Sequence, residues 1–457
     1  MQNGASQPDI YALIESRDFA ALKNALKDME VHDLADLLRD LQGENLGLCF
    51  RLLSQETAGE VLAELEPEQR EHLITTLSSE KLAGILNDMA PDDRTELLEE
   101  LPGELAQALL SQLRGEELQI ARSLLAYPED SIGRLMTPEY VAVRPEWTVQ
   151  QVLDHIRKVG PDKETLNVLL AVGDGGRLVG QVWLEDLILA EPDRPVRELM
   201  EEHLDALRAR DDREDAIEVF RKYDAVALPV LNRQDILVGI VTVDDVLDVA
   251  EEETTEDFQR IAGMEPLEYS YFGTGFLAML RKRLPWLVML LAAQTLTTIA
   301  LLGFDKLPLF ALLVLFMPLV NSPAGNTGTQ MAGLMIRGLA VAEVGLKDWW
   351  RVLLRELTRG LALGLMLAVL GFTAALVFSY FAHLKVDEPW RVALSVSLAI
   401  AVAVTLANLL GSMLPFLFKR VGLDPAVTSG PFIASLMDVS GILIYFGIAT
   451  TILAVTA

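Results

Sequence analysis

Asp438 is the one acidic or basic residue in the apolar segment PFIASLMDVSGILIYFGIATTILA, residues 431–454. A carboxylate near the middle of a membrane-spanning helix costs at least ~2.5 kcal/mol, and it usually faces a protein interior or a water-filled cavity. No Lys or Arg lies inside any predicted span to neutralise it. We therefore predict that a mobile cation supplies the counter-charge. The alternative is a protonated Asp438 that is hydrogen-bonded to a neighbouring helix.

The surroundings of Asp438 suit a hard cation. Such ions take oxygen ligands, and Mg²⁺ keeps several waters while one or two carboxylates bind it. Gly430, Ala434 and Gly441 share a helical face with Asp438, so another helix can approach this face closely. The membrane potential would supply about 4.6 kcal/mol per 100 mV to a divalent ion that moves inward. We predict a transport site near Asp438.

Enzymatic activity is not expected. The sequence has neither the nucleotide-binding pattern GxxxxGK[ST] nor the zinc pattern HExxH. Asp438 also lacks a second carboxylate inside a predicted span with which it could form a catalytic dyad.

A second polar feature lies at residues 317–330, MPLVNSPAGNTGTQ, inside a longer run without any charged residue. Pro323 lacks a backbone donor and disfavours helix at Ser322, so we expect the helix to break here and leave carbonyl groups free. Such backbone is tolerated at membrane depth only where protein buries it or water reaches it. We therefore expect Asn326 to line a polar pathway, with Asn408 of the fourth span as a further candidate. The alternatives are close helix packing for this stretch and an interhelical hydrogen bond for Asn408.

Five charge-poor runs in the second half of the chain each exceed the roughly 20 residues that span a bilayer. An odd number of spans puts the two ends of the chain on opposite sides. Of the 13 basic residues from 276 onward, ten flank one side of the predicted spans and three flank the other. Since cytoplasmic loops are enriched in Lys and Arg, we expect cytoplasmic N-terminal domains and an outward C-terminus. The predicted spans are 284–304, 307–336, 361–384, 392–418 and 425–457.

Charge is distributed unevenly along the chain. Residues 1–275 hold 58 acidic and 25 basic residues, a net charge of −33, whereas the remainder has a net charge of +5. Such an acidic surface repels nucleic acid, so its expected partners are cations or basic proteins. The single cysteine, Cys49, excludes a disulfide framework and fits a reducing compartment. The first residues have neither the basic start nor the apolar core of a signal peptide.

The first part of the chain contains a 12-residue repeat. Each copy has a turn, an acidic residue at a helix start, and about two turns of apolar helix. Helices this short must stack to be stable, which predicts a helical solenoid from about residue 8 to 126. Most of the repeated acids suit the helix dipole and have a structural role. The copies begin at Leu41, Leu53, Leu65, Leu77, Met89, Leu101 and Leu113.

From residue 127 the pattern changes to short strands alternating with helices. Residues 134–188 and 196–249 carry the similar stretches LVGQVWLEDLI (178–188) and LVGIVTVDDVL (237–247) at their C-terminal ends, and each range resembles a cystathionine-β-synthase (CBS) module. The resemblance implies a pseudo-symmetric pair that dimerises and binds regulatory ligands. Thr242 and Asp245 have the T-x-x-D spacing with which such modules hold a ribose, whereas Trp183 replaces the Thr in the first half. ATP is therefore a candidate ligand near Asp245.

The segment DDVLDVAEEETTED, residues 244–257, holds eight acids and no base. Asp245, Asp248, Glu252 and Glu256 lie on one stripe at helical spacing, where like charges destabilise a helix. The common interpretation of such a run is a solvated face, but bound cations would relieve this repulsion. The segment leads directly into the first predicted span, so a ligand that it senses would act close to the membrane.

Together these features resemble the MgtE family of magnesium channels and transporters along nearly the whole chain. The most specific stretches are AGNTGTQ, LANLLGSMLPFLFKR and LMDVSGILIYF, with YPEDSIGRLMTPEYVAV and GIVTVDDVLDV in the acidic half. The implied fold is multidomain: an all-α helical solenoid, α/β tandem CBS domains, an acidic connecting (plug) helix and an all-α five-helix transmembrane domain. The expected boundaries are 1–126, 127–190, 191–248, 249–275 and 276–457. Ser322-Pro323-Ala324 departs from the Gly-rich sequence expected before AGNTG.

The resemblance also implies a function. The protein would be a homodimer in the cell inner membrane that conducts Mg²⁺ inward, with hydrated Mg²⁺ at Asp438 and backbone near Ala434. Cytosolic acids would bind regulatory Mg²⁺ and favour closure. The alternatives are a CBS-regulated transporter of Co²⁺ or Mn²⁺ and a membrane-anchored CBS sensor. The positions that correspond to regulatory acids are Asp224, Asp245, Asp248, Glu253, Glu256 and Asp257, and Asp92 and Asp93 are further candidates.

Overall fold

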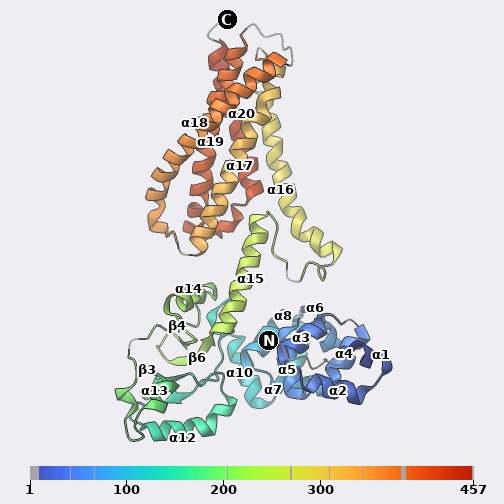
Figure 1. Ribbon diagram of the computed structural model, residues 1–457, viewed down its shortest axis with the longest axis vertical. Coiled ribbons are helices and arrows are strands. Elements are labelled where there is room, and N and C mark those ends of the chain that lie inside the picture. The colour runs from blue at the N-terminus through green and yellow to red at the C-terminus, as the bar shows by residue number, and fades with distance from the viewer. Residues whose placement is uncertain are drawn as a thin grey trace, which may run out of the picture. The chain divides into compact units, whose positions relative to one another are not determined.

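The computed structural model describes residues 10–41, 43–65, 67–202, 204–267, 270–307, 309–341, 343–381 and 388–454. The chain divides into two compact units, Met1–Glu251 and Glu252–Ala457 (Figure 1). Short helices and two small sheets make up the first unit, whereas long helices dominate the second.

Short helices form the N-terminal part of the first unit. From α4 to α10 they begin every 12 residues, at 43, 55, 67, 79, 91, 103 and 115, as the repeat predicts. Alternate helices pack on one another, for example α3 on α5 and α5 on α7, so each buries an apolar face that it could not bury alone. This confirms the helical solenoid. The bounds are α1 (Ile10–Ser16), α2 (Phe19–Lys27), α3 (Val31–Arg39), α4 (Gly43–Leu52), α5 (Gln55–Glu64), α6 (Pro67–Thr76), α7 (Ser79–Asp88), α8 (Pro91–Glu100), α9 (Gly103–Leu110) and α10 (Gly115–Leu124).

The repeat sets the helix starts through its turn residues. Ser54 and Ser78 accept hydrogen bonds from the backbone N–H groups of Thr57 and Lys81, which would otherwise have no partner in the first turns of α5 and α7. Pro91 begins α8, where its missing N–H has no consequence.

Two similar α/β modules complete the first unit. Each has a three-stranded sheet in which the first strand is parallel to the second and the third is antiparallel, with a register shift near the end of the second strand. Thr137, which precedes the sheet of the first module, pairs with Ile240 of the second module, so the two modules are joined. The elements are α11 (Ile132–Leu135), β1 (Ala142–Val143), α12 (Val149–Val159), β2 (Val168–Val172), β3 (Leu178–Trp183), α13 (Leu184–Leu189), β4 (Leu207–Arg208), α14 (Glu214–Tyr223), β5 (Ala227–Leu231) and β6 (Leu237–Thr242), with 3₁₀ turns at Gly160–Asp162, Asp174–Gly176 and Val196–Glu198.

The acidic segment is helical, as expected. It lies in α15 (Val243–Ile261), which begins in the first unit and ends in the second. Gly263 follows this helix with φ 78°, a left-handed conformation that favours glycine and stops a helix.

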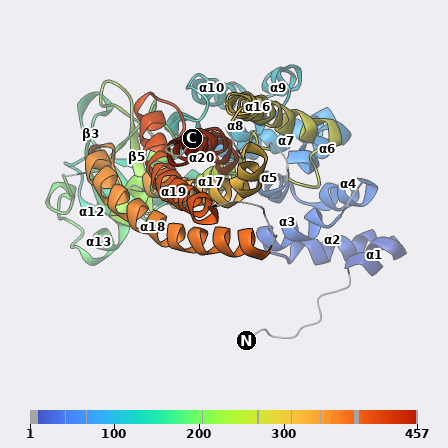
Figure 2. The ribbon, with the colours of Figure 1, turned by 90° about the horizontal axis from the view of Figure 1, so that it is seen from above.

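The second unit contains five helices, within its described residues, that are long and apolar enough to cross a membrane. Their central member is α19, which packs against α17, α18 and α20, while α16 packs on α20. Figure 2 shows α17, α19 and α20 between α16 and α18. The bounds are α16 (Phe276–Leu302), α17 (Phe310–Ala340), α18 (Trp349–Phe381), α19 (Pro389–Arg420) and α20 (Gly430–Ala454), with 3₁₀ turns at Leu346–Asp348 and Pro425–Val427.

The prediction that the helix breaks at Pro323 is wrong, because α17 is one continuous helix that contains both Pro318 and Pro323. A proline removes only one intrahelical donor, and neighbouring polar side chains can satisfy freed backbone groups. The carbonyl oxygen that Pro323 leaves without its helical donor is that of Leu319, and one turn later Thr327 Oγ1 donates at 2.8 Å to the carbonyl oxygen of Pro323 itself. The polar residues of this segment are therefore displayed on a helix, at helical spacing, and not on an unwound loop.

Candidate ion site and acidic clusters

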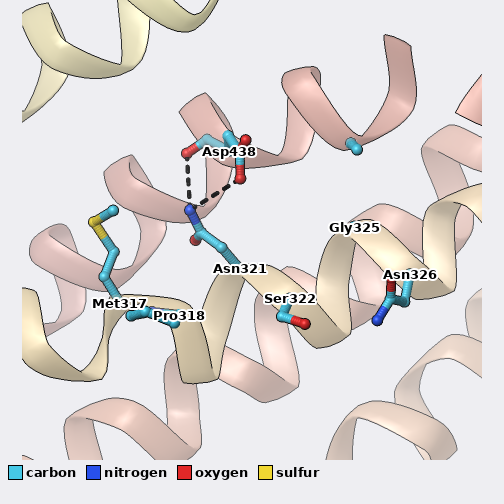
Figure 3. Close-up of a pocket in the computed structure, with 8 residues that line it drawn as sticks. Met317, Pro318, Asn321, Ser322, Gly325, Asn326 and Asp438 are labelled. Atoms are coloured by element: carbon cyan, nitrogen blue, oxygen red, sulfur yellow. Dashed lines mark hydrogen bonds between the residues drawn. The ribbon is translucent and has the colours of Figure 1, made fainter. Parts of the chain in front are cut away.

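A hollow of about 330 Å³ opens on α17 and α20 in the second unit (Figure 3). Three of the four residues predicted for the ion pathway lie along it: Asn326 on α17, and Ala434 and Asp438 one turn apart on α20. Amide, hydroxyl and carboxylate oxygens are thus collected in an otherwise apolar helix bundle, and these are the ligands that hard cations prefer. The lining residues are Met317, Pro318, Asn321, Ser322, Gly325, Asn326, Ala434 and Asp438.

Asp438 has a hydrogen-bond donor opposite it on α17. Nδ2 of Asn321 lies 3.3 Å from the backbone carbonyl oxygen of Asp438 and 3.4 Å from its Oδ1. The two side chains point toward one another in Figure 3. Asn321 was not among the predicted ion-path residues, although it lies in the polar stretch 317–330, five residues before Asn326.

Further hydrogen bonds hold α20 against α17 on both sides of Asp438. The Tyr445 hydroxyl donates to the carbonyl oxygen of Leu313 at 3.1 Å, and Thr329 Oγ1 donates to the carbonyl oxygen of Gly430 at 3.2 Å. Both groups are partly or fully buried, so loss of either bond would leave a buried polar group without a partner. The position of Asp438 along α17 is therefore fixed from both ends.

Small residues let the helices around the hollow approach closely. A Cβ on Gly411 of α19 would collide with the carbonyl oxygen of Gly328 on α17, and a Cβ on Gly325 would touch Ala434 at 3.7 Å. Close packing through small residues was the alternative to a polar lining. Both occur in the same stretch of α17. Gly325 belongs to both features, since it also lines the hollow.

Asn408 does not line the hollow, and it makes the interhelical hydrogen bond that was the alternative to a place in the ion pathway. Its Nδ2 donates to the backbone carbonyl oxygen of Glu356 on α18 at 2.9 Å and to Glu356 Oε2 at 3.1 Å. Arg359 donates to the other carboxylate oxygen at 2.7 Å. Packing of α18 against α19 places Glu356 opposite Asn408, so the Asn408 amide is used in an interhelical hydrogen bond.

A first acidic cluster lies where the solenoid meets α15, within the first unit. Burial, and then the charges of Asp245, Asp93 and Glu164, raise the pKa of Asp92 well above its usual value. Burial, with the charges of Glu96, Asp245 and Glu164, raises the pKa of Asp93 to about 7. Burial likewise raises the pKa of Asp245 to about 7. Three predicted regulatory acids are thus brought together.

Glu164 joins this cluster although no local sequence pattern points to it. Burial raises its pKa, with further contributions from the charges of Asp244 and Glu139. It follows α12 in a connecting segment without a recognisable pattern, and only tertiary packing brings it near the solenoid. One carboxylate oxygen of Asp92, Oδ1, is buried without a hydrogen-bond partner among the described residues.

Thr242 and Asp245, the two residues predicted to bind a nucleotide, are hydrogen-bonded to each other. Thr242 donates to Asp245 Oδ2 from its hydroxyl at 2.6 Å and from its backbone N–H at 3.3 Å. This arrangement caps the start of α15, and it also holds the Asp245 carboxylate at the edge of the acidic cluster. A ribose would have to compete for the same carboxylate oxygen.

The other predicted regulatory acids are dispersed. Burial, followed by the charges of Glu64 and Glu96, raises the pKa of Asp248, so this side chain faces the solenoid. Asp224 is exposed and ends α14 in a left-handed conformation with φ 48°. Glu253 is half-buried on α15.

A second acidic cluster lies in the second unit, at the end of α15. Arg260 donates to Glu256 at 2.6 Å and to Asp424, in the segment before α20, at 2.8 Å. Burial, and then the charge of Asp424, raise the pKa of Asp257 to about 6. The structure thus adds Asp424, which is remote in the chain, to the predicted acids Glu256 and Asp257.

Neither cluster forms a closed ligand shell. In the part of the chain that the structure describes, no group of three or more His, Cys, Asp or Glu side chains is arranged to hold a metal ion. The carboxylates instead face one another across packed surfaces, where their mutual repulsion and burial favour binding of protons or cations.

Family models match three parts of the chain. A model named MgtE, described as a divalent cation transporter, matches residues 317–448 and so includes the hollow. A model of the MgtE intracellular N domain matches residues 29–130. The CBS domain model matches twice, at residues 132–193 and 196–252.

Several relatives are similar over most of their length. The magnesium transporter MgtE of Thermus thermophilus is 40% identical over 332 residues, which are 72% of this chain and 72% of that protein. The magnesium transporter MgtE of Enterococcus faecalis is 34% identical over 72% of this chain and 70% of its own. That of Bacillus subtilis is 33% identical over 73% and 72%.

Two solved structures resemble the first part of the chain. One is the cytosolic domain of the Mg²⁺ channel MgtE in complex with ATP, with 37% identity and a TM-score of 0.51; the match covers 52% of this chain and 98% of that one. The other is the soluble part of a magnesium transporter, with 25% identity and a TM-score of 0.51, covering 53% and 96%.

Proposed function

Because this chain belongs to the MgtE family of divalent cation transporters, we propose that it transports Mg²⁺ across a membrane through the hollow around Asp438. The observation that carries the proposal is the set of oxygen-bearing side chains, Asp438, Asn326 and Ser322, along one hollow between two long apolar helices. One carboxylate with neutral oxygens suits an ion that keeps most of its waters. A volume of about 330 Å³ accommodates several waters of about 30 Å³ each.

A second copy of the chain would complete the pathway. Ser322 and Asn326 are exposed in a single chain, although they lie on a helix long enough to cross a membrane. Polar side chains are unfavourable against lipid and are expected to face protein or water. A homodimer that covers this face of α17 would enclose the hollow and place two Asp438 carboxylates beside one ion path.

We propose inward transport into the cytoplasm. Ten of the 13 basic residues from 276 onward lie on the side of the predicted spans from which the chain enters the first span, which supports a cytoplasmic location for the acidic N-terminal part and an outward C-terminus. A divalent ion gains about 4.6 kcal/mol per 100 mV on entering a negative cytoplasm. Transport of Mg²⁺ therefore requires no coupled ATPase.

Cytosolic Mg²⁺ would control opening and closing of the pathway. Asp92, Asp93 and Asp245 have raised pKa values because they are buried close together, so their ionised forms oppose the packing of the solenoid on the CBS pair. Mg²⁺ bound between them would remove this repulsion and favour the compact state. Such gating requires that the ion bind the compact state more tightly than the loose one.

ATP is a second proposed ligand of the CBS pair. A relative's cytosolic domain has been solved in complex with ATP, and Thr242 and Asp245 have the T-x-x-D spacing from which ribose binding is predicted. Since Asp245 also belongs to the acidic cluster, ATP and Mg²⁺ would compete for or share this carboxylate.

The decisive experiment is Mg²⁺ flux into proteoliposomes that contain only the purified protein. Wild type should conduct Mg²⁺ when the Mg²⁺ concentration on the side of the N-terminal domains is low. The flux should fall when the concentration on that side is raised to millimolar. Asp438→Ala should abolish flux, while Asp305→Ala, which removes a carboxylate from the segment between α16 and α17, should not.

The same assay separates the alternatives. Equal flux in Asp438→Ala would assign Asp438 a structural role and reject the proposed pathway. Stronger transport of Co²⁺ or Mn²⁺ than of Mg²⁺ in direct competition would favour a carrier for those ions. Absence of flux for any divalent cation would favour a membrane-anchored CBS sensor.

A further inference from the structure

We infer that Asn321 is a positioning residue, which holds the Asp438 carboxylate in the orientation in which it meets the transported ion. The inference rests on the proposed function, because it assigns a role inside the same hollow. Asn321 would act through Asp438 and need not touch the ion itself.

The amide orientation follows from its two neighbours. Nδ2 of Asn321 lies 3.3 Å from the backbone carbonyl oxygen of Asp438 and 3.4 Å from Oδ1 of its carboxylate. Exchanging the amide oxygen and nitrogen would put Oδ1 of Asn321 against these two acceptors, which is unfavourable. The amide therefore donates toward α20, as the dashed lines in Figure 3 indicate.

One donor shared between these two oxygens ties the side chain of Asp438 to its own backbone. The carboxylate loses rotational freedom, and its second oxygen, Oδ2, remains available to accept a hydrogen bond from a water of the ion. Ordering a polar side chain in advance reduces the entropy that binding must otherwise remove. Because both contacts are long for N–H···O bonds, we expect a modest effect on affinity and not an absolute requirement.

The amide oxygen of Asn321 indicates that this arrangement lowers the stability of the fold. Asn321 is 8% exposed, and its Oδ1 is buried without a hydrogen-bond partner among the described residues. A buried acceptor without a partner destabilises a fold, and such groups are concentrated where function demands them. A small apolar residue would avoid this cost if packing alone were needed at position 321.

Gly441 provides the space for that amide. It lies on α20 three residues after Asp438, and a Cβ at this position would collide with Oδ1 of Asn321. Gly447 on the same helix has no heavy atom within 4 Å of the position of a Cβ. The absence of a side chain at Gly441 is thus matched to Asn321, which provides a second way to displace the amide without changing it.

The test measures Mg²⁺ flux as a function of Mg²⁺ concentration in proteoliposomes of the full chain. Asn321→Ala should raise the half-saturating Mg²⁺ concentration about 5-fold, the order expected for one hydrogen bond of ordinary net strength, and leave the maximal flux unchanged. Gly441→Ala should shift the half-saturating concentration in the same direction. Gly447→Ala is the matched control and should behave as wild type.

The combined variant Asn321→Ala/Gly441→Ala discriminates further. If both changes act by releasing the same amide, the double variant should resemble Asn321→Ala alone, whereas independent packing defects would add. A loss of maximal flux with an unchanged half-saturating concentration would indicate fewer folded molecules and would overturn the inference. So would wild-type behaviour of both single variants.

The outcome for wild type separates this inference from the proposed function. No Mg²⁺ flux in wild type would reject the transport function and with it the role of Asn321. Wild-type flux that depends on Asp438 but is unaffected in Asn321→Ala and Gly441→Ala would retain the transport function and reject only the positioning role.

Discussion

Asn408 on α19 donates to both the backbone carbonyl oxygen and the carboxylate of Glu356 on α18, at 2.9 and 3.1 Å. Glu356 is 4% exposed, so its carboxylate depends on Asn408 and on Arg359 for hydrogen bonds. Removing one partner of a buried charge is more costly than the net value of the bond, because the charge stays buried. This pair therefore joins α18 to α19 and lies outside the hollow around Asp438.

Asn408→Leu is expected to lower the free energy of unfolding by about 1–3 kcal/mol through the unsatisfied Glu356 carboxylate. Thermal denaturation in detergent measures this change. Ser397→Ala, which removes a neutral hydrogen bond to Ala368 between the same two helices, is the control and should have a smaller effect. A changed half-saturating Mg²⁺ concentration for flux through Asn408→Leu would instead support a place for Asn408 in the ion pathway.

Low pH and Mg²⁺ should stabilise the first unit in the same way. Burial raises the pKa of Asp93 and of Asp245 to about 7, compared with about 3.9 in an unfolded chain. Because the folded value is the higher one, the stabilisation is complete below about pH 4 and is lost as the pH rises through about 7. Without Mg²⁺, the melting temperature of this unit should therefore fall between pH 6 and pH 8. Millimolar Mg²⁺ should suppress that fall.

The acids of the first cluster must carry this pH dependence. Asp93→Asn and Asp245→Asn should each flatten the pH profile and weaken the Mg²⁺ response, since an amide cannot be titrated. Asp154→Asn changes an exposed acid of α12 and serves as the control. A pH profile that persists unchanged in Asp93→Asn/Asp245→Asn would refute this account.

Arg260 is expected to hold the second acidic cluster together. It is bonded to Glu256 and Asp424, and its charge opposes the repulsion that raises the pKa of Asp257. Arg260→Gln should lower the free energy of unfolding by about 1–3 kcal/mol, because half-buried carboxylates lose their counter-charge. Thermal melts with and without Mg²⁺ test this.

Two further measurements qualify the prediction for Arg260. Added Mg²⁺ should restore part of the lost stability, and Arg260→Gln/Asp424→Asn should recover part of it without Mg²⁺. If the double variant is as unstable as the sum of both single changes, the repulsion between carboxylates is not the cause.

Gly411 should tolerate no side chain. Its Cβ would collide with the carbonyl oxygen of Gly328, so Gly411→Ala must push α19 away from α17. We expect overpacking to cost about 1–3 kcal/mol and to reduce the yield of folded protein in size-exclusion chromatography. Gly333→Ala, where no heavy atom lies within 4 Å, is the control on α17. Equal yields and melting temperatures for both variants would contradict the close packing.

Periodic patterns accounted for most of the fold. The 12-residue repeat determined the starts of α4 to α10, because each copy carries its own turn and first helical turn. Charge-poor runs likewise predicted the five long helices, since a bilayer dictates the length of an apolar segment. These features are local in sequence, and local features can be recognised without knowing what they pack against.

The sequence by itself also determined the ion-site candidate Asp438, because a lone carboxylate in an apolar span is costly wherever the span packs. Only the tertiary structure decided its neighbours. The continuous α17 places Asn321 opposite Asp438, Glu356 takes up the amide of Asn408, and Glu164 and Asp424 enter the acidic clusters from distant segments. The physical reason is that partners of polar groups are set by packing between elements, and hydrophobic periodicity carries no information about which polar side chains will meet.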